Sequence, residues 1–330
     1  MSKAYIKWFY DIKDCQRISG QLPSIIPTSA WGWCISPAWD AALFIIPWQM
    51  YNTYGDKTVL ELVYENMERY LNFLFRAADD FIIELWLGDW CPPKNQKCDC
   101  PAVVTSTAYF YMASDIMVNI SKVLNKESKK WEDMAQDVKI AWRKKFLGDL
   151  KLYDSQTFLA CGIYCGLLTA DEEKAFSKKL SELVIDNDYH TDCGILGQKF
   201  IFDALCKYGY HEVVYKMVVN PTMPSYAYWF NNGATTLCET WSMNSSNNHN
   251  MFSEVDNWMY KYIGGLNFSE GELTINPIYF ENISEVDVKY KNLTVRRKEK
   301  SVFVSAKEKV YVIVGNKKIE LENDELMYLL

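Results

Sequence analysis

Residues 155–185 read SQTFLACGIYCGLLTADEEKAFSKKLSELVI, and this stretch shows how most of the chain is organised. Apolar residues recur at helical spacing on both sides of Thr169, over residues 155–168 and 170–185. Thr169 is a favoured N-cap residue, and acidic residues fill the turn after it, where the helix dipole favours negative charge. The stretch therefore predicts a hairpin of two helices, with Thr169 as the cap of the second.

The same plan recurs from about residue 40 to residue 262. We expect further helices at residues 41–54, 57–76, 104–124, 128–146, 196–208, 210–219 and 252–263. No sequence repeat of fixed period accompanies these pairs, so a solenoid of the TPR or HEAT type is not expected. Serial hairpins without repeat identity are typical of a closed α/α toroid, in which inner and outer helices alternate.

Long loops separate the hairpins, and the pattern changes after Gly265. The loops are rich in Pro, Gly and Trp and cover residues 17–39, 86–103, 186–195 and 220–251. Loops of this length in a compact domain are usually functional. Between residues 272 and 321 short runs alternate with period two, as strands do. We therefore predict a mainly α region over residues 1–265 and a small antiparallel β-sandwich over residues 266–330.

Composition excludes several classes of protein. The chain has 330 residues, with 35 Lys and Arg against 42 Asp and Glu, and no basic stripe suited to a phosphate backbone, so no nucleic-acid partner is expected. The one basic cluster, residues 296–298, lies in a strand-like run and is interpreted as a solvated strand face. No apolar run reaches membrane length, so no membrane partner is expected. Aromatic residues make up 15% of the chain, which fits either core packing or stacking against sugars.

The first residues and the cysteines of the chain indicate in which cellular compartment the protein is found and whether it binds a metal ion or a cofactor. Residues 1–8 contain no signal-peptide core, so we expect a cytoplasmic protein with reduced cysteines. Cys91, Cys98 and Cys100 cluster without paired CxxC spacing or a nearby His, so no metal site is expected. Phosphate loops, dinucleotide fingerprints and HExxH motifs are missing from the sequence, and no cofactor is predicted.

Three loop segments contain candidate catalytic or substrate-binding residues. Gly233-Ala-Thr-Thr-Leu-Cys-Glu239-Thr-Trp241 sets a carboxylate among small and aromatic residues, with His249 shortly after it. That combination suits acid–base work on a hydroxyl-rich substrate, although Glu239 could equally cap a helix or pair with a Lys. In Gly88-Asp89-Trp90 the carboxylate and the ring either face a cleft together or form a tight turn. Asp40, after Trp39, fits either a site or an N-cap.

Taken together, these motifs resemble the bacterial α-L-rhamnosidases of glycoside hydrolase family 78. Order and approximate spacing hold across residues 8–265. The matching stretches are Asp14-Cys-Gln16, Gly20-Gln-Leu-Pro23, Pro37-Ala-Trp39, Pro47-Trp48, Tyr54-Gly-Asp56, Gly88-Asp-Trp90, Thr105-Ser-Thr-Ala-Tyr109, Gln156-Thr157, His190-Thr-Asp-Cys-Gly194, Pro224-Ser-Tyr226, Gly233-Ala-Thr-Thr-Leu-Cys-Glu239-Thr-Trp241 and Asn248-His249 to Trp258. The family's (α/α)6 barrel and C-terminal β-domain agree with the fold predicted above.

The resemblance implies a role for each matched residue. Glu239 corresponds to the general base that activates water for inverting hydrolysis of a terminal α-L-rhamnoside. Trp39 and Trp90 correspond to aromatic residues that contact the sugar, and His249 to a residue that hydrogen-bonds its hydroxyls. Asp89, beside Trp90, and Asp40, one place before a position that is often acidic in the family, complete the predicted substrate-binding set. The implied partner is a rhamnose-containing oligosaccharide or glycoside.

The sequence departs from the family in one important respect. The family's general acid lies in an Arg-Asp-Glu stretch, and this sequence contains no such run. Inverting hydrolysis needs two carboxyl groups roughly 6.5–9.5 Å apart. We therefore expect a truncated enzyme whose missing N-terminal part carries the acid, with an incomplete helical ring. The alternatives are one half of a split enzyme, a sugar-binding protein without activity, and a decayed reading frame without a stable fold.

Overall fold

A computed structural model describes residues 2–27, 32–33, 37–84, 87–93 and 99–330, and helices dominate it up to residue 263. The α-helices are α1 (Ser2–Cys15), α2 (Pro37–Asp40), α3 (Ala42–Tyr54), α4 (Thr58–Ala77), α5 (Ala102–Val123), α6 (Lys129–Phe146), α7 (Gln156–Tyr164), α8 (Ala170–Asp186), α9 (Ile195–Cys206), α10 (His211–Val219), α11 (Tyr226–Asn231) and α12 (Glu254–Trp258). Two short helical turns, η2 (Leu150–Asp154) and η3 (Met259–Ile263), complete them. The predicted mainly α region is confirmed.

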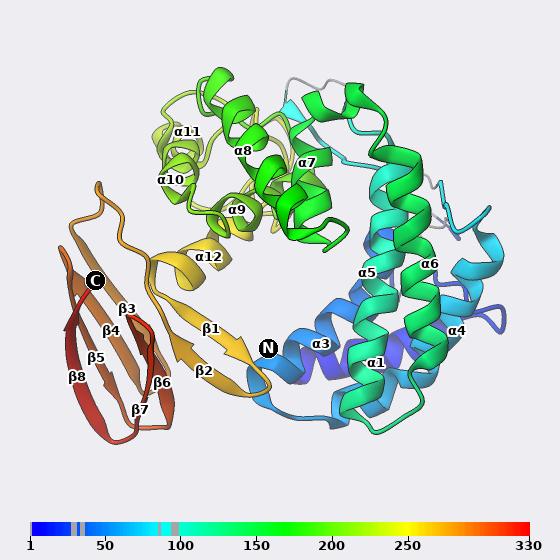
Figure 1. Ribbon diagram of the computed structural model, residues 1–330, viewed down its shortest axis with the longest axis horizontal. Coiled ribbons are helices and arrows are strands. Elements are labelled where there is room, and N and C mark those ends of the chain that lie inside the picture. Colours follow the sequence, from blue (N-terminus) through cyan, green and yellow to red (C-terminus); the bar gives the residue numbers. More distant parts are fainter. Residues whose placement is uncertain (1, 28–31, 34–36, 85–86, 94–98) are drawn as a thin grey trace.

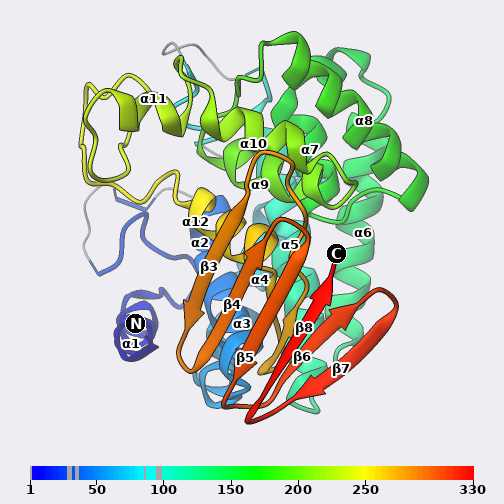
Figure 2. The same ribbon diagram turned by 90° about the vertical axis from the view of Figure 1, so that its left-hand side faces the viewer.

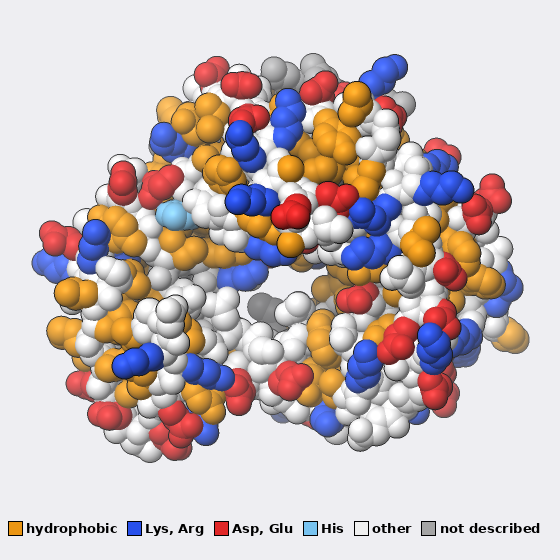
Figure 3. Space-filling model, in the orientation of Figure 1, with side chains coloured by type: hydrophobic (Ala, Val, Ile, Leu, Met, Phe, Trp, Pro, Cys, Tyr) orange, Lys and Arg blue, Asp and Glu red, His pale blue; other side chains and the backbone are white. Residues whose placement is uncertain are grey.

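Helical hairpins form the wall of an open ring. Figure 1 shows α3, α5, α7, α9 and α12 around a central opening, which Figure 3 shows to persist when side chains are drawn in full. Eight of the nine residues of α7 are buried, against six of the 17 residues of α8, its partner in the hairpin. Inner helices are thus covered on nearly every side, whereas outer helices bury one face. The predicted toroid is confirmed.

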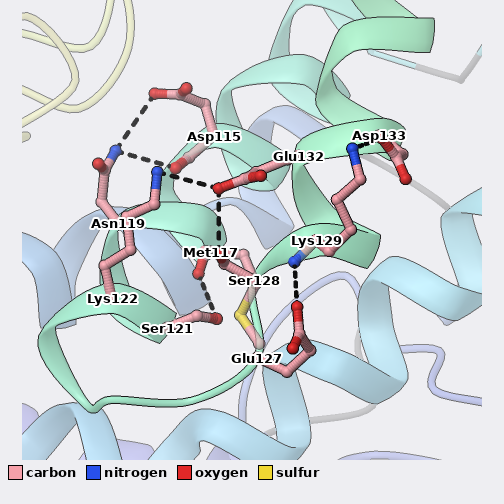
Figure 4. Close-up of polar contacts among 10 residues, drawn as sticks. All are labelled: Asp115, Met117, Asn119, Ser121, Lys122, Glu127, Ser128, Lys129, Glu132 and Asp133. Carbon is pink, nitrogen blue, oxygen red and sulfur yellow. Dashed lines mark hydrogen bonds and ion pairs between the residues drawn. The ribbon is translucent and has the colours of Figure 1, made fainter.

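Caps and ion pairs fix individual hairpins. Thr169 accepts a hydrogen bond from the Glu172 backbone, and Glu172 reaches back to the Thr169 amide, so the predicted cap is a complete capping box. In the α5–α6 hairpin, Lys122 lies 3.0 Å from Glu132, which also accepts from Ser128 at the start of α6 (Figure 4). These contacts lie at helix ends, where backbone groups lack partners within the helix.

The predicted helices do not include α1, α2 or α11. α1 buries only Phe9 and Ile12, and its remaining described side chains are partly or fully exposed, so its apolar stripe is narrow. α11 is six residues long and lies within the long loop that precedes Glu239. Ser225 caps it by accepting a hydrogen bond from the Tyr228 amide. At six residues, α11 is too short to be stable in isolation and depends on tertiary contacts.

Eight strands follow the helices and form two four-stranded sheets. They are β1 (Leu266–Ser269), β2 (Glu272–Ile275), β3 (Glu285–Tyr290), β4 (Leu293–Lys298), β5 (Ser301–Ala306), β6 (Val310–Val314), β7 (Lys317–Leu321) and β8 (Asp324–Leu329). Their orders are β1-β2-β6-β7 and β3-β4-β5-β8, and all pairs are antiparallel except β2 with β6. Figure 2 shows the second sheet face on. This confirms the predicted antiparallel β region at the C-terminal end.

The β region has its own core and is tied to the helical ring. Val295, Val302 and Val304 are among its fully buried residues, in a cluster separate from that of the helices. The turn between β1 and β2 donates two backbone hydrogen bonds to Asn52 near the end of α3, at 2.8 and 3.2 Å. The β1–β2 hairpin therefore borders the same opening as the inner helices (Figure 1).

The interpretation of residues 296–298 as a solvated face is wrong for Arg297. This residue is 1% exposed, because alternate positions of β4 (Leu293, Val295 and Arg297) face the core. Its guanidinium donates to the carbonyls of Glu299 and Ile283 at 2.7 and 2.8 Å, which offsets part of the cost of burying the charge.

Candidate active site

The loop that carries Glu239 is held by an aromatic cluster. The rings of Trp229 and Trp241 stack with their centroids 4.6 Å apart, and Phe252 packs against Trp241 at 4.5 Å. The Trp229 indole also donates to the Trp241 carbonyl at 2.9 Å. All three rings are buried, so the chain on either side of Glu239 has a fixed path. This placement was not predicted for Trp229, whose partners become visible only when the loop is folded.

Glu239 presents an ionised carboxylate near the surface. Its Oε2 accepts hydrogen bonds from the Ser245 hydroxyl at 2.6 Å and the Ser246 amide at 3.3 Å. These two bonds, with a smaller contribution from His249, lower the pKa of the carboxyl. The group is therefore charged at neutral pH, which is the state that a general base needs.

His249 lies in the same loop and is oriented by its backbone neighbours. Its amide donates to the Leu237 carbonyl at 2.9 Å, and its Nδ1 accepts from the Met251 amide at 3.0 Å. Because Nδ1 is an acceptor, the neutral ring carries its proton on Nε2. The loop thus brings together a carboxylate and an imidazole that can donate a hydrogen bond.

Asp89 is buried, and protein groups surround its carboxylate. It is 5% exposed and accepts from the Thr157 hydroxyl at 2.5 Å. It also accepts from the amides of Gly194, Leu196 and Gly197, at 2.8, 2.7 and 3.0 Å. These amides are at the N-terminus of α9, where the helix dipole favours a negative charge. Asp89 therefore ties the turn at residues 88–91 to α9.

Asp40 is also buried, and the two predicted tryptophans differ in exposure. Asp40 is 6% exposed at the end of α2 and accepts from the Tyr70 hydroxyl at 2.8 Å. Trp39, next to it, packs partly buried against the main core. Trp90 is 50% exposed, while its carbonyl accepts from the Ile195 amide at 2.8 Å. Trp90 therefore has a half-exposed side chain and a backbone that is hydrogen-bonded to the start of α9.

The turn at residues 88–91 and the Glu239 loop approach one another. The charge of Glu239 adds to burial in raising the pKa of the Cys91 thiol. A small cavity of about 50 Å³ lies between the two segments and is lined by Cys91, Pro92, Pro93, Met223, Thr240, Trp241 and Ser242. Of the sequence-predicted residues, Glu239 and His249 share one loop, and the segment that follows Trp90 meets that loop.

Asp192 is a titratable residue that sequence reasoning left without a role. Burial raises the pKa of its carboxyl to about 7, and the charges of Asp99 and Asp89 add to the rise. The residue lies within the quoted stretch His190 to Gly194, so the motif marked the segment. The rise in the pKa, beyond the part due to burial, depends on charges from distant parts of the chain.

Metal and membrane features are not found in the described part of the chain. Over those residues, no group of three or more His, Cys, Asp or Glu is arranged to hold a metal ion. Cys91 and Cys100 of the predicted cysteine cluster are not in disulfides, and Cys98 lies outside the described residues. In the same part of the chain, every helix is too short or too polar to cross a bilayer.

Comparisons with known proteins agree with these features. Residues 1–263 match the bacterial alpha-L-rhamnosidase 6 hairpin glycosidase domain. An alpha-L-rhamnosidase of Formosa agariphila is 27% identical over 285 residues, which are 80% of this chain and 31% of that protein. One of Streptomyces avermitilis is 26% identical over 275 residues, 79% of this chain and 26% of the relative. The chain thus spans less than a third of the length of these relatives.

Solved structures show the same fold. An alpha-L-rhamnosidase from Dictyoglumus thermophilum superposes with a TM-score of 0.86 and 33% identity, over 94% of this chain and 38% of that one. The Streptomyces avermitilis enzyme in complex with L-rhamnose gives a TM-score of 0.85 at 21% identity, over 96% and 33%. The resemblance inferred from the motifs is confirmed: the chain belongs to the bacterial alpha-L-rhamnosidase six-hairpin glycosidase family.

Proposed function

We propose that this chain is the base-bearing, sugar-binding part of an α-L-rhamnosidase that hydrolyses terminal α-L-rhamnosides with inversion. The observation that carries the proposal is the Glu239 carboxylate, which is held by Ser245 and Ser246, has a lowered pKa and lies on a loop braced by buried aromatic rings. Family membership supports the reaction class, since the relatives named above are alpha-L-rhamnosidases.

In the proposed step, Glu239 takes a proton from a water molecule whose oxygen attacks the anomeric carbon of rhamnose. The bond to the glycosidic oxygen breaks, and that oxygen leaves with a proton from a general acid. His249 donates through Nε2 to a sugar hydroxyl. Trp39 and Trp90 contact the apolar faces of the ring, and Trp90 has half of its surface available for this.

The general acid is the second element of the proposal. The sequence contains no Arg-Asp-Glu run, and an inverting site needs a second carboxyl group across the sugar from Glu239. We propose that a further segment of the enzyme, joined or separate, supplies it. Two large apolar residues of η3 support this, because Met259 and Tyr260 are exposed at 44% and 51% and a further segment would cover them.

Asp89 and Asp40 act as positioning residues in this proposal. Asp89 fixes the backbone that carries Trp90, and Asp40 follows Trp39 directly and is held by Tyr70. Residues 1–265 would form the catalytic region and residues 266–330 an accessory unit. A cytoplasmic location belongs to the same proposal and agrees with the lack of disulfides among the eight described cysteines.

Turnover of an aryl α-L-rhamnoside with a good leaving group tests the proposal, because such a group needs little protonation. The full chain should release rhamnose slowly, and proton NMR should show the β-anomer first. Glu239→Gln should lower the rate by about 10²-fold or more. Glu285→Gln, the same change on an exposed strand residue, is the matched control. Equal rates in the Glu239 variant and the wild type would refute the assignment.

A second function is sugar binding without turnover, which the single carboxylate of the Glu239 loop favours. Titration with L-rhamnose, followed by Trp fluorescence, separates the two. Saturable binding with no release from the aryl rhamnoside supports the binding function, and a lack of binding excludes both.

A further inference from the structure

Strand β8 forms one edge of the sheet with the order β3-β4-β5-β8. Among the described strands its only hydrogen-bonded neighbour is β5. Figure 1 shows β8 on the side of the β region that faces away from the helical ring. The edge therefore presents backbone groups to which a further strand can bond.

Every second amide of β8 points away from β5. Leu330 donates to the Lys300 carbonyl at 2.9 Å, and hydrogen-bonded pairs alternate with unbonded pairs along an antiparallel ladder. The amides and carbonyls at odd positions of β8, such as Met327, therefore point to the free edge. Glu325 agrees with this, because its amide donates to the Asp324 carboxylate at 2.8 Å and not to β5.

The sequence of β8 differs from that of other edge strands in the β region. β3, at the opposite edge of the same sheet, reads EVDVKY and has a charged residue at every second position. β7, at one edge of the other sheet, begins with two lysines. Charged residues, and lysine above all, protect an edge against pairing with another strand. β8 is charged only at its first two residues and then reads LMYL, so it lacks this protection.

The outer face of the β3-β4-β5-β8 sheet changes from charged to apolar toward β8. Over β3 and β4, two ion pairs of 3.3 Å lie on this face. Over β5 and β8, Phe303 lies opposite Met327, and Met327 and Leu329 are exposed at 69% and 75%. Exposed apolar side chains that gather in one place are typical of an interaction surface.

The charge pattern of β8 fits a second copy of the chain in antiparallel register. When Met327 of each copy lies opposite the other, the acidic end of β8, Asp324 and Glu325, lies opposite the apolar end of the second copy. Because Lys300 bonds to Leu330, Lys300 of the second copy then lies about two strand spacings, roughly 10 Å, from this acidic end. Parallel pairing would instead set the two acidic ends against each other, which is unfavourable.

We propose that β8 is the interface of a homodimer, in which the β8 edges of two copies pair antiparallel about a twofold axis at Met327. Such an interface is self-complementary, as a twofold axis requires. The two sheets become one sheet of eight strands, and Phe303, Met327 and Leu329 of both copies form a continuous apolar strip on its outer face. The proposal is independent of the function proposed above, because β8 lies outside the helical region that carries Glu239.

Sedimentation velocity of the full chain tests the proposal. The paired edge has six residues, fewer than a standard interface, so we expect a dissociation constant on the order of 10–100 µM. Met327→Lys sets two like charges against each other at the twofold axis and should raise this constant at least about tenfold. Leu150→Lys is the matched control, because Leu150 is 77% exposed on η2, outside the β region. A wild-type monomer up to about 500 µM, or wild-type dimerisation of Met327→Lys, would overturn the proposal.

A charge reversal tests the antiparallel register. Lys300→Glu replaces the attraction for the acidic end of the second copy by repulsion and should raise the dissociation constant by about threefold or more at low salt. Lys289→Glu makes the same change on β3, at the opposite edge of the sheet, and should leave the constant unchanged. Equal effects of the two changes would overturn the register.

Hydrogen exchange on the wild-type chain covers the case in which a variant does not fold. The amides of Met327 and Leu329 should exchange more slowly at a protein concentration above the dissociation constant than below it. The amides of β3 should exchange equally at both concentrations. A dimer that leaves the β8 amides unprotected would place the interface elsewhere on the molecule and overturn the proposal.

Discussion

Two loops of this molecule each carry a carboxylate beside a tryptophan, and the structure uses them differently. Asp89, before Trp90, is 5% exposed and accepts from one hydroxyl and three amides. Glu239, two places before Trp241, lies near the surface and accepts from Ser245 and Ser246. In the first loop the carboxylate is buried and the tryptophan is half exposed, and in the second the tryptophan is buried and the glutamate is partly exposed.

This difference indicates that the Asp89 carboxylate supports the structure, whereas the Glu239 carboxylate is available for catalysis. A carboxylate whose lone pairs are taken by helix-terminal amides is a structural anchor, and it has little capacity left to accept a proton from water. A carboxylate on a braced but open loop keeps that capacity. Substitution of Asp89 should therefore change mainly the stability, and substitution of Glu239 mainly the activity.

Asp89→Ala should have the largest effect on stability. Removing the carboxylate leaves three α9 amides and the Thr157 hydroxyl without this buried partner. We expect a loss of about 3 kcal/mol or more in the free energy of unfolding, measured with urea. Asp133→Ala is the control, because it removes only the exposed ion pair between Asp133 and Lys129 within α6. It should change the free energy of unfolding by less than about 0.5 kcal/mol. Similar values for the two variants would contradict the anchor role.

Gly197→Ala should disturb the same anchor by a steric route. A Cβ at this position would lie 2.2 Å from Thr157 Oγ1 and 2.8 Å from the Cys193 side chain. We expect a loss of about 1–3 kcal/mol in unfolding free energy, the usual cost of overpacking a core. Gly148→Ala is the control, because a Cβ there meets nothing within 4 Å. Full stability of the Gly197 variant would show that α9 can move away from Asp89.

Asp192 should make stability fall as pH rises. Its folded pKa of about 7 exceeds the ordinary value of 3.8, so the folded state binds the proton more tightly than the unfolded state. The resulting stability is present below pH 3.8 and is lost progressively as pH rises toward 7. Between pH 5 and 7, unfolding free energies of the wild type should drop by about 1–2 kcal/mol more than those of Asp192→Asn. Glu254, whose pKa is also about 7, contributes equally to both proteins. Parallel pH curves would contradict the shift.

Glu239→Gln should have the smallest effect on stability. The side chain lies near the surface, and an amide oxygen can still accept from Ser245 and Ser246. We expect a change within about 0.5 kcal/mol in urea unfolding, as for other surface substitutions. A loss close to that of Asp89→Ala would mean that both carboxylates are anchors.

The fold could largely be predicted from the sequence, because helix periodicity and strand alternation are local signals. The helices from α3 to α10 begin and end within a few residues of the predicted ranges, and the Thr169 cap is confirmed. The charge of Arg297 favours an exposed position, but the period of two places it on the buried face of β4, and the second signal is the one that holds.

The candidate site was less predictable, for a physical reason. The partners of Asp89 lie 68 to 108 residues away in the sequence, so nothing local shows that its carboxylate is enclosed. The pKa of Asp192 likewise depends on Asp89 and Asp99. By contrast, Glu239 is held by residues six and seven places along, and its role as the base stays a prediction from the motif that contains it.

The rate at which Glu239→Gln releases rhamnose from an activated aryl rhamnoside, on protein whose unfolding free energy has been measured, tests the central claim most directly. We predict wild-type stability together with a rate lowered by about 10²-fold or more, since the base is lost and the fold is kept. Wild-type turnover in this variant would contradict the claim that Glu239 activates the water.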